Sequence, residues 1–210
     1  MIAVIDYDMG NLRSVANALK SLGADVMVTR QRSVIESASH VVLPGVGAFK
    51  DCISNLIDFG LVDPVLKSIE TGKPFLGICL GLQVLFEEGL EFGSYKGLGI
   101  LKGQVVRFND HMAGSDGTPL KIPHMGWNDI KIEKESALLK GIPEGSYFYF
   151  VHSYCARPSE PEAVNLTTTE YGVRFTSAIE VDNIMALQFH PEKSQRLGLK
   201  ILKNFMDLKY

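Results

Sequence analysis

Short apolar runs alternate with amphipathic segments through the first half of the chain. The runs with the length of buried strands are residues 2–6, 25–29, 40–43 and 75–78. Segments with helical spacing occur at residues 11–23, 51–70 and 80–87. The middle segment should be interrupted near Gly60 and Pro64, which are poor helix formers. This order of strands and helices predicts a parallel sheet with helices on both faces.

The second half has shorter apolar runs, separated by turn signals such as Asp182-Asn183. The predicted strands are residues 104–108, 128–133, 146–154, 163–169, 173–180 and 184–189. Residues 109–118 form a polar loop, and Ser194 opens a final helix. Antiparallel pairing would extend the main sheet and add a smaller antiparallel sheet. We find no repeat and no linker, so we expect one α/β domain over residues 1–210, with an open, mostly parallel twisted sheet.

Charge and composition narrow the class of protein. The 210-residue chain has a net charge of −3 and no long run of Lys or Arg, so nucleic acid is a poor candidate partner. No apolar stretch approaches the ~18 residues that a membrane span requires. Residues 1–8 resemble a first strand rather than a signal peptide. We therefore expect a cytoplasmic protein with no membrane partner.

The cysteines Cys52, Cys79 and Cys155 form no CxxC pair, so we expect free thiols, no metal site and no cofactor. Only Cys79 has a distinctive setting, between Gly77 and Gly81, where a strand should end and a helix begin. A Gly-x-nucleophile-x-Gly turn lifts a side chain above the carboxyl edge of a sheet, and the following helix favours a thiolate. The alternative is a small buried residue in a tight turn, which is our interpretation of Cys52 and Cys155.

A base for this cysteine is His190, which follows the last predicted strand. Glu192 stands two residues later and can orient the imidazole by accepting a hydrogen bond, as the third member of a triad does. A histidine at a strand end can equally be structural. The other histidines are weaker candidates: His40 as a structural group, His111 as a solvated one, His124 as a packing or hinge group, and His152 as part of an aromatic core run.

The loop Pro44-Gly45-Val46-Gly47 ends the third predicted strand with two glycines. Its amides can join the amide of Leu80 in an oxyanion hole, where each donor contributes ~2.7–4 kcal/mol to the rate. Pro-Gly is also common in ordinary turns, so the loop suggests this function only together with Cys79.

Three segments together resemble the class I (triad) glutamine amidotransferases. They read PGVG from residue 44, GICLGLQ from residue 77 and HPE from residue 190. The resemblance implies that Cys79 attacks the side-chain amide of L-glutamine, that His190 moves the proton, and that Glu192 orients His190. It also implies a cysteinyl thioester, which is hydrolysed after ammonia has left. By position, the oxyanion and substrate-binding residues would be Gly45, Val46, Gly47, Leu80, Gln83, Ser153 and Tyr154.

Three further segments resemble one branch of this family, the glutaminase subunits of imidazole glycerol phosphate synthases from histidine biosynthesis. They are residues 6–14, 123–128 and 149–154. The resemblance implies a heterodimer with a cyclase subunit, a (β/α)₈ barrel through which ammonia would travel. The residues expected to face this partner are Asn11, Pro123, His124, Met125, Trp127 and Asn128. From the sequence, Trp127 is as good a core residue as an interface anchor.

Two other functions stay open on the sequence alone. A standalone cysteine peptidase or γ-glutamyl hydrolase would use the same nucleophile on a related sheet without a partner. A scaffold subunit with a decayed site would need no chemistry, although Cys79, His190 and Glu192 are all present. Glutamate release from glutamine, with and without a barrel partner, distinguishes the three.

Overall fold

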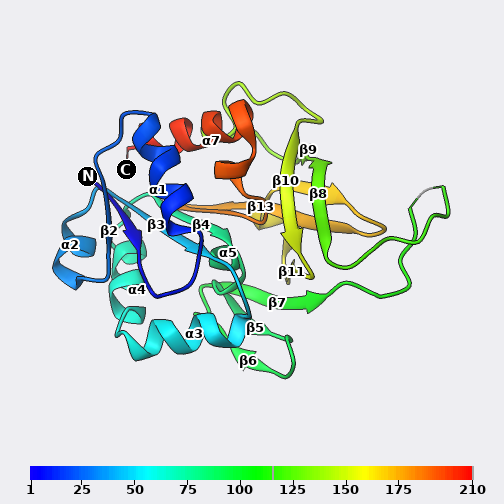
Figure 1. The fold of residues 1–210 in the computed structure, drawn as a ribbon, viewed down its shortest axis with the longest axis horizontal. Coiled ribbons are helices and arrows are strands. Elements are labelled where there is room, and N and C mark those ends of the chain that lie inside the picture. Colours follow the sequence, from blue (N-terminus) through cyan, green and yellow to red (C-terminus); the bar gives the residue numbers. More distant parts are fainter. Residues whose placement is uncertain (115, 210) are drawn as a thin grey trace.

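The computed structural model of the chain describes residues 1–114 and 116–209. Its centre is an eight-stranded sheet with the strand order β2–β1–β3–β4–β14–β13–β12–β9 (Figure 1). These strands are β1 (Ile2–Ile5), β2 (Val26–Thr29), β3 (His40–Gly45), β4 (Phe75–Cys79), β9 (Lys131–Ile132), β12 (Asn165–Glu170), β13 (Arg174–Val181) and β14 (Ile184–Leu187). Neighbours from β2 to β14 pair in parallel, whereas β13, β12 and β9 continue the sheet antiparallel. The predicted α/β class is confirmed.

Helices cover both faces of the parallel strands, as predicted (Figure 1). They are α1 (Leu12–Ser21) and α7 (Gln195–Asp207) on one face, and α2 (Arg32–Ser37), α3 (Phe49–Asp58) and α4 (Val62–Glu70) on the other. Side chains alternate along β1. Val4 therefore belongs to the same buried cluster as Val15 of α1, while Ile5 belongs to the cluster of Leu56 of α3. The core is two apolar layers with the sheet between them.

Two smaller sheets accompany the main sheet, where the sequence predicted one from the second half. In the first, β10 (Tyr147–His152) pairs antiparallel with β8 (His124–Asp129), at the β12–β13 end of the main sheet (Figure 1). The second contains β5 (Phe86–Gly89), β6 (Tyr95–Lys96), β7 (Leu101–Arg107) and β11 (Tyr154–Pro158). It is not wholly antiparallel, because β5 and β7 pair in parallel. The predicted strand 146–154 is therefore divided between two sheets.

The predicted helix 80–87 is wrong beyond its first turn. The helix α5 (Leu80–Gln83) ends early, and Phe86 already pairs with Leu101 of β7. All residues from Leu80 to Phe86 are buried. The apolar run therefore has no polar face by which its periodicity can separate helix from strand.

Smaller differences concern the ends of elements. The segment 51–70 is interrupted at Gly60, which has a φ of +64°, but Pro64 lies in the first turn of α4, where its missing N–H is tolerated. The predicted strand 128–133 starts earlier and breaks at the buried Ile130, because β8 and β9 belong to different sheets. The sequence also did not predict α2, α6 (Pro161–Val164) or the 3₁₀ turn at Pro191–Lys193.

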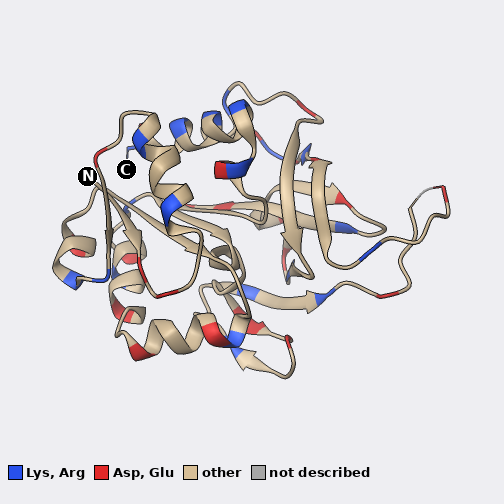
Figure 2. Ribbon diagram, viewed as in Figure 1, with Lys and Arg blue, Asp and Glu red and all other residues tan. Residues whose placement is uncertain are grey.

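Charged residues occur mainly on helices and loops, and β1, β3 and β4 carry no Lys, Arg, Asp or Glu (Figure 2). Within residues 1–114 and 116–209, no helix has the length and apolar character to cross a bilayer. The polar segment predicted at 109–118 leaves the body of the protein between β7 and β8 (Figure 1). Residue 115 of this segment lies outside the described residues.

Candidate active site

Cys79 occupies the sharp turn between β4 and α5, at the carboxyl edge of the parallel strands. Its φ of 55° and ψ of −107° lie outside the regions open to most L residues. Such a conformation costs ~1–3 kcal/mol and persists only where the surrounding structure imposes it. The predicted strand-to-helix elbow is confirmed, with the cysteine 7% exposed.

The two glycines beside Cys79 let the strand and the helix pass at contact distance. A Cβ on Gly77 would lie 2.6 Å from the carbonyl oxygen of Gly81. A Cβ on Gly81 would lie 1.9 Å from the carbonyl oxygen of Leu43 on β3. Only glycine therefore fits at either position. The sequence predicted this role for both residues, namely to let strand and helix pass closely.

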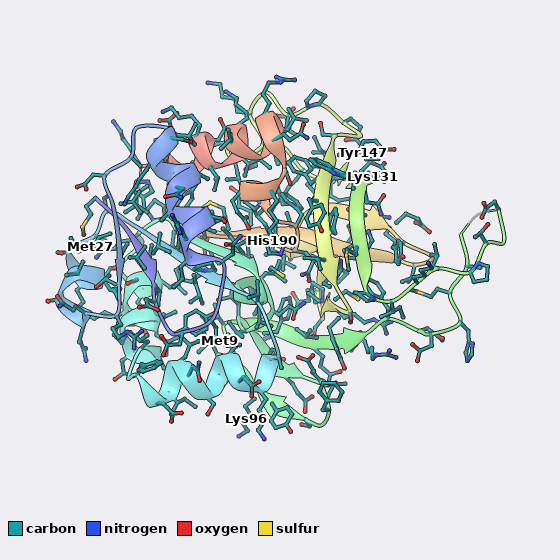
Figure 3. The ribbon with its side chains drawn as sticks, in the orientation of Figure 1. Met9, Met27, Lys96, Lys131, Tyr147 and His190 are labelled. Carbon is teal, nitrogen blue, oxygen red and sulfur yellow. The ribbon has the colours of Figure 1, made fainter. Side chains whose placement is uncertain are left out.

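His190 and Glu192 reach the same region from the end of β14, and Figure 3 places His190 near the centre of the molecule. The Nδ1 of His190 is 2.9 Å from the Oε1 of Glu192, and their side chains are only 2% and 0% exposed. The backbone is also held, because the amide of His190 donates to the carbonyl of Tyr149 at 2.9 Å and the Ser194 hydroxyl donates to the carbonyl of His190 at 2.6 Å. The contact expected of an orienting carboxylate is present.

Opposing effects set the protonation of His190. Burial by itself lowers the pKa of the imidazole, but hydrogen bonding and the charges of Cys79 and Glu192 outweigh burial and raise the pKa to about 9. The buried Nε2 has no hydrogen bond of regular geometry to any other described residue. The imidazole is therefore protonated on both nitrogens at neutral pH, with Nδ1 donating to Glu192.

A cavity of about 260 Å³ opens beside the elbow. Its lining contains Val46, Gly47, Cys79, Leu80, Gln83, Glu91, Pro123, Val151, His152, Ser153 and Tyr154. Every predicted substrate residue except Gly45 is among them. Glu91 is the only carboxylate in this lining, and no motif marked it in the sequence. Larger hollows of about 440 and 580 Å³ are lined by neither Cys79 nor His190.

The loop at residues 44–47 is held against the elbow by Tyr7, which sequence reasoning missed. The buried Tyr7 hydroxyl donates to the carbonyl of Pro44 at 2.6 Å. A Cβ on Gly45 would lie 2.5 Å from that hydroxyl and 2.8 Å from the Cβ of Leu80, so Gly45 allows close packing behind the cavity. Gly47 has a φ of +103°, which favours glycine, and it lines the cavity.

Two amide side chains connect the cavity wall to the sulfur. The Nε2 of Gln83 donates to the carbonyl of Tyr154 and to the Oε1 of Gln188, each at 3.0 Å. The Nε2 of Gln188 lies 3.7 Å from the Sγ of Cys79. Gln188 was not predicted. Its position two residues before His190, in the short segment that follows β14, is the signal that identifies it.

His152 and His124 form a buried pair next to the cavity. The Nδ1 of His152 donates to the carbonyl of Tyr154 at 2.8 Å, so its Nε2 accepts from the Nδ1 of His124 at 3.0 Å. The Nε2 of His124 then accepts from Asn128 at 3.3 Å. Burial lowers the pKa of His124 to about 4 and that of His152 to about 3, so both rings are neutral at pH 7. The packing roles predicted for these histidines are confirmed, with the His152 ring 5.1 Å from that of Phe175.

The residues expected at a partner interface differ in exposure. Met125 and Trp127 are 62% and 46% exposed on the same side of β8, which excludes a core position for Trp127. Pro123 is exposed, and Asn11 and Asn128 are half-buried. His124 is 3% exposed on the opposite side of β8, so a direct partner contact through its ring is not available in this conformation.

The remaining predicted non-catalytic groups behave as expected. Cys52 and Cys155 are buried, and burial raises their pKa values to about 12 and about 11, so neither thiol is ionised at neutral pH. The Nε2 of His40 is 3.1 Å from the carbonyl of Leu208, a structural contact, and His111 is exposed.

Residues 3–208 match the family model of glutamine amidotransferase class-I. The chain belongs to the class-I glutamine amidotransferase family. It is 50% identical to the imidazole glycerol phosphate synthase subunit HisH of Syntrophotalea carbinolica, over 99% of this chain and 100% of the relative. It is 54% identical to the subunit of the same name from Aquifex aeolicus, over 96% of this chain and 94% of the relative.

Solved structures share the fold at low sequence identity. A glutamine amidotransferase crystal structure has a TM-score of 0.72 and 20% identity, over 99% of this chain and 98% of the other. The structure of PurLQS from Thermotoga maritima has a TM-score of 0.69 and 17% identity, over 98% of this chain and 97% of the other. Together with the family model, these results confirm the predicted class of enzyme, a glutamine amidotransferase with glutaminase activity.

Proposed function

We propose that the chain is the glutaminase subunit of an imidazole glycerol phosphate synthase. It hydrolyses L-glutamine to glutamate and ammonia, and it passes the ammonia to a cyclase subunit in histidine biosynthesis. The observation that carries the proposal is the position of Cys79, on a strained elbow at a cavity, together with the hydrogen-bonded pair His190–Glu192. The narrower assignment is supported by the identity of 50% to a HisH subunit over almost the whole chain.

The first half-reaction forms a thioester. With the proton on His190, the sulfur of Cys79 attacks the side-chain amide carbon of glutamine, and the carbonyl π electrons move to the oxygen. The amides of Gly47 and Leu80 stabilise this oxyanion. His190 then gives its proton to the nitrogen, which leaves as ammonia when the C–N bond breaks. Glu192 keeps the imidazole oriented throughout.

The second half-reaction hydrolyses the thioester. The neutral His190 takes a proton from a water molecule while the water oxygen attacks the thioester carbon. The C–S bond breaks, the sulfur leaves as a thiolate, and the imidazolium of His190 is restored. The sum of the two steps is glutamine plus water giving glutamate plus ammonia.

The lining of the cavity suits the polar ends of glutamine. Glu91 is placed to attract the α-ammonium group, because it is the only carboxylate in the lining. One of its oxygens accepts from the amide of Phe49 at 2.6 Å, which holds the carboxylate at the start of α3. Ser153 and Tyr154 border the same space, and Gln83 lies at its inner wall.

The partner in this proposal is the cyclase subunit, a (β/α)₈ barrel, in a heterodimer. The outer side of β8 supports it, since Met125 and Trp127 are exposed apolar side chains of the kind that anchor interfaces. Asn11, Pro123 and Asn128 are the further proposed contacts, and the buried His124 acts through Asn128, to which it is hydrogen-bonded.

The proposal also covers the domain organisation and the cellular location of the protein. Residues 1–210 form a single amidotransferase domain, which is supported by β4 and β14 joining both halves of the chain in one sheet. The protein works in the cytoplasm, as a biosynthetic enzyme with free buried thiols suggests.

Glutamate release tests the proposal. The protein is assayed alone, with the cyclase subunit, and with the cyclase subunit and its ligand. We expect weak activity alone and a large increase in the full complex. Cys79→Ala should abolish glutamine-dependent synthesis and leave synthesis from free ammonia, whereas the matched variant Cys155→Ala, which removes another buried thiol, should preserve both. Equal loss of both activities in Cys79→Ala would contradict the proposal.

The same assay identifies the alternatives. Strong peptidase or γ-glutamyl hydrolase activity without a partner would identify a standalone hydrolase, and the absence of glutamate under every condition would identify a scaffold. The interface is tested by Trp127→Ala, which should weaken the complex about thirtyfold, as loss of a hot-spot residue does. Phe92→Ala, at a side chain 87% exposed and outside the proposed interface, should leave the affinity unchanged.

A further inference from the structure

Gln188 is a buried amide that the chemistry above does not use. Its side chain is fully buried, and its Nε2 lies 3.7 Å from the Sγ of Cys79. Gln188 and His190 both interact with the side chain of Cys79, while Phe189 between them is stacked 4.4 Å from the ring of Phe148. One short segment therefore brings two polar side chains to the same sulfur.

The neighbours of Gln188 determine which end of its amide faces the sulfur. The carbonyl oxygen of Tyr154 can only accept, so Gln83 must turn its NH₂ group toward it. The same NH₂ group donates to Gln188, which must present its Oε1 in that direction. The NH₂ group of Gln188 is then left to face Cys79, and the reverse orientation would place two donors against each other.

We propose that Gln188 is a further residue of the catalytic centre, which donates a hydrogen bond to the Cys79 sulfur and favours its thiolate form. Its part in turnover rests on the proposed glutaminase function, but its effect on the sulfur does not. A hydrogen bond to an ionised acceptor is about twice as strong as one between neutral groups, so the amide favours S⁻ over S–H.

This donor has a role in both half-reactions. The sulfur is an anion before it attacks glutamine, and it becomes one again when it leaves the thioester. The sequence predicted that the helix after Cys79 would stabilise this charge. That helix, α5, has a single turn from Leu80 to Gln83, so little macrodipole is available, and the amide of Gln188 supplies a directed donor instead.

Alkylation by iodoacetamide measures the effect without glutaminase activity. The rate is followed against pH by intact mass in the full-length protein, with Cys79→Ala to identify the reacting thiol. Gln188→Met removes the donor at similar volume. Gln188→Glu keeps an acceptor for Gln83 and puts a negative charge beside the sulfur. We expect the pH midpoint of alkylation to rise by about one to two units in Gln188→Met and further in Gln188→Glu.

Turnover in the complex supplies a second readout. For Gln188→Met we expect kcat to fall roughly ten- to a hundredfold, with KM for glutamine within about twofold of wild type. The exposed Gln104 offers the matched control, since Gln104→Met should change neither alkylation nor kcat. If kcat is low for every protein including wild type while the alkylation midpoints shift as expected, the glutaminase proposal fails and the role of Gln188 stands.

A folded Gln188→Met variant with unchanged alkylation midpoint would overturn the inference. If both variants fail to fold, the inference can still be tested on the wild-type protein by NMR. The side-chain NH₂ resonances of Gln188 should follow pH with the same midpoint as alkylation, and they should lose this dependence in Cys79→Ala. Resonances that do not respond to pH in the wild-type protein would equally overturn it.

Discussion

The hydroxyl of Tyr7 donates a 2.6 Å hydrogen bond to the carbonyl of Pro44, which starts the loop beside Cys79. The thiol of Cys52 donates in turn to the Tyr7 hydroxyl at 3.3 Å. Burial raises the pKa of Tyr7 well above its ordinary value, so the phenol stays protonated and able to donate. A side chain from the segment between β1 and α1 thus holds the loop at residues 44–47 in place.

Tyr7→Phe removes this hydrogen bond and keeps the ring. We expect the free energy of unfolding to fall by about 1 kcal/mol, the usual contribution of one such bond, and kcat to fall up to about tenfold because the loop is less well placed. Urea unfolding and glutamate release in the complex measure the two effects. Tyr147→Phe, at a side chain 57% exposed, is the control and should change neither. Wild-type stability and kcat in Tyr7→Phe would show that the loop is held by other contacts.

Glu192→Gln replaces the carboxylate that faces Nδ1 of His190. The amide carries no charge to stabilise the imidazolium, so we expect the pKa of His190 to fall and kcat to drop by about 10²–10⁴-fold, the range of general acid–base catalysis. Steady-state glutamate release in the complex measures kcat, while synthesis from free ammonia should persist. Glu162→Gln, on the exposed helix α6, is the matched control. A kcat within a factor of two of wild type would remove Glu192 from the mechanism.

Gly81→Ala would place a methyl carbon 1.9 Å from the carbonyl oxygen of Leu43, a backbone atom in the middle of the sheet. This clash can be relieved only if β3 and α5 separate. We therefore expect a loss of at least about 3 kcal/mol in the free energy of unfolding, together with loss of activity. Gly60→Ala is an informative comparison, because its Cβ meets nothing within 4 Å and only its φ of +64° opposes the change. That variant should lose about 1–2 kcal/mol and remain active. Similar stabilities for the two variants in urea unfolding would refute the steric argument.

The buried histidine pair predicts how stability depends on pH. Burial holds the pKa of His152 at about 3 and that of His124 at about 4, whereas both titrate near 6.5 in the unfolded chain. Between those values the unfolded chain binds more protons, so stability is fully present above about pH 6.5 and decreases as the pH falls toward 4. Each histidine contributes at most about 1.4 kcal/mol per pH unit.

His190 acts in the opposite direction. Its pKa is raised to about 9, so the stability that it contributes is fully present below about pH 6.5 and is lost as the pH rises toward 9. Urea unfolding at a series of pH values measures the loss of stability toward both acid and alkaline pH. We expect His152→Gln to reduce only the loss toward acid pH. His111→Gln, at an exposed position, should change neither loss. If the free energy of unfolding falls as steeply toward acid pH in His152→Gln as in wild type, His152 is not a source of this pH dependence.

The local sequence was informative wherever a short segment carries its own signal. The elbow could be predicted because Gly77 and Gly81 flank a cysteine at the end of an apolar run, and only glycine tolerates that approach. The pair His190 and Glu192 could be predicted because the two residues are close in the chain. The alternation of strand and helix gave the parallel sheet, and short apolar runs gave its antiparallel extension.

Contacts between distant segments left no such signal. The chain after Gln83 pairs with β7 instead of continuing as a helix, and this choice depends on β7 itself, because the intervening residues are buried on all sides. Likewise, the amide chain from Tyr154 through Gln83 and Gln188 to Cys79 joins separate elements whose side chains meet only after folding.

By itself, the sequence determined the alternation of strands and helices in the first half, the elbow at Cys79, the His190–Glu192 pair and the resemblance to the family, because periodicity, glycine sterics and short-range motifs are local properties. Tertiary structure alone decided the length of α5, the division of strands between two small sheets, the exposure of Trp127 and the donors around the sulfur. Those features follow from pairing and burial, which are free-energy balances over the whole chain rather than preferences of any one segment.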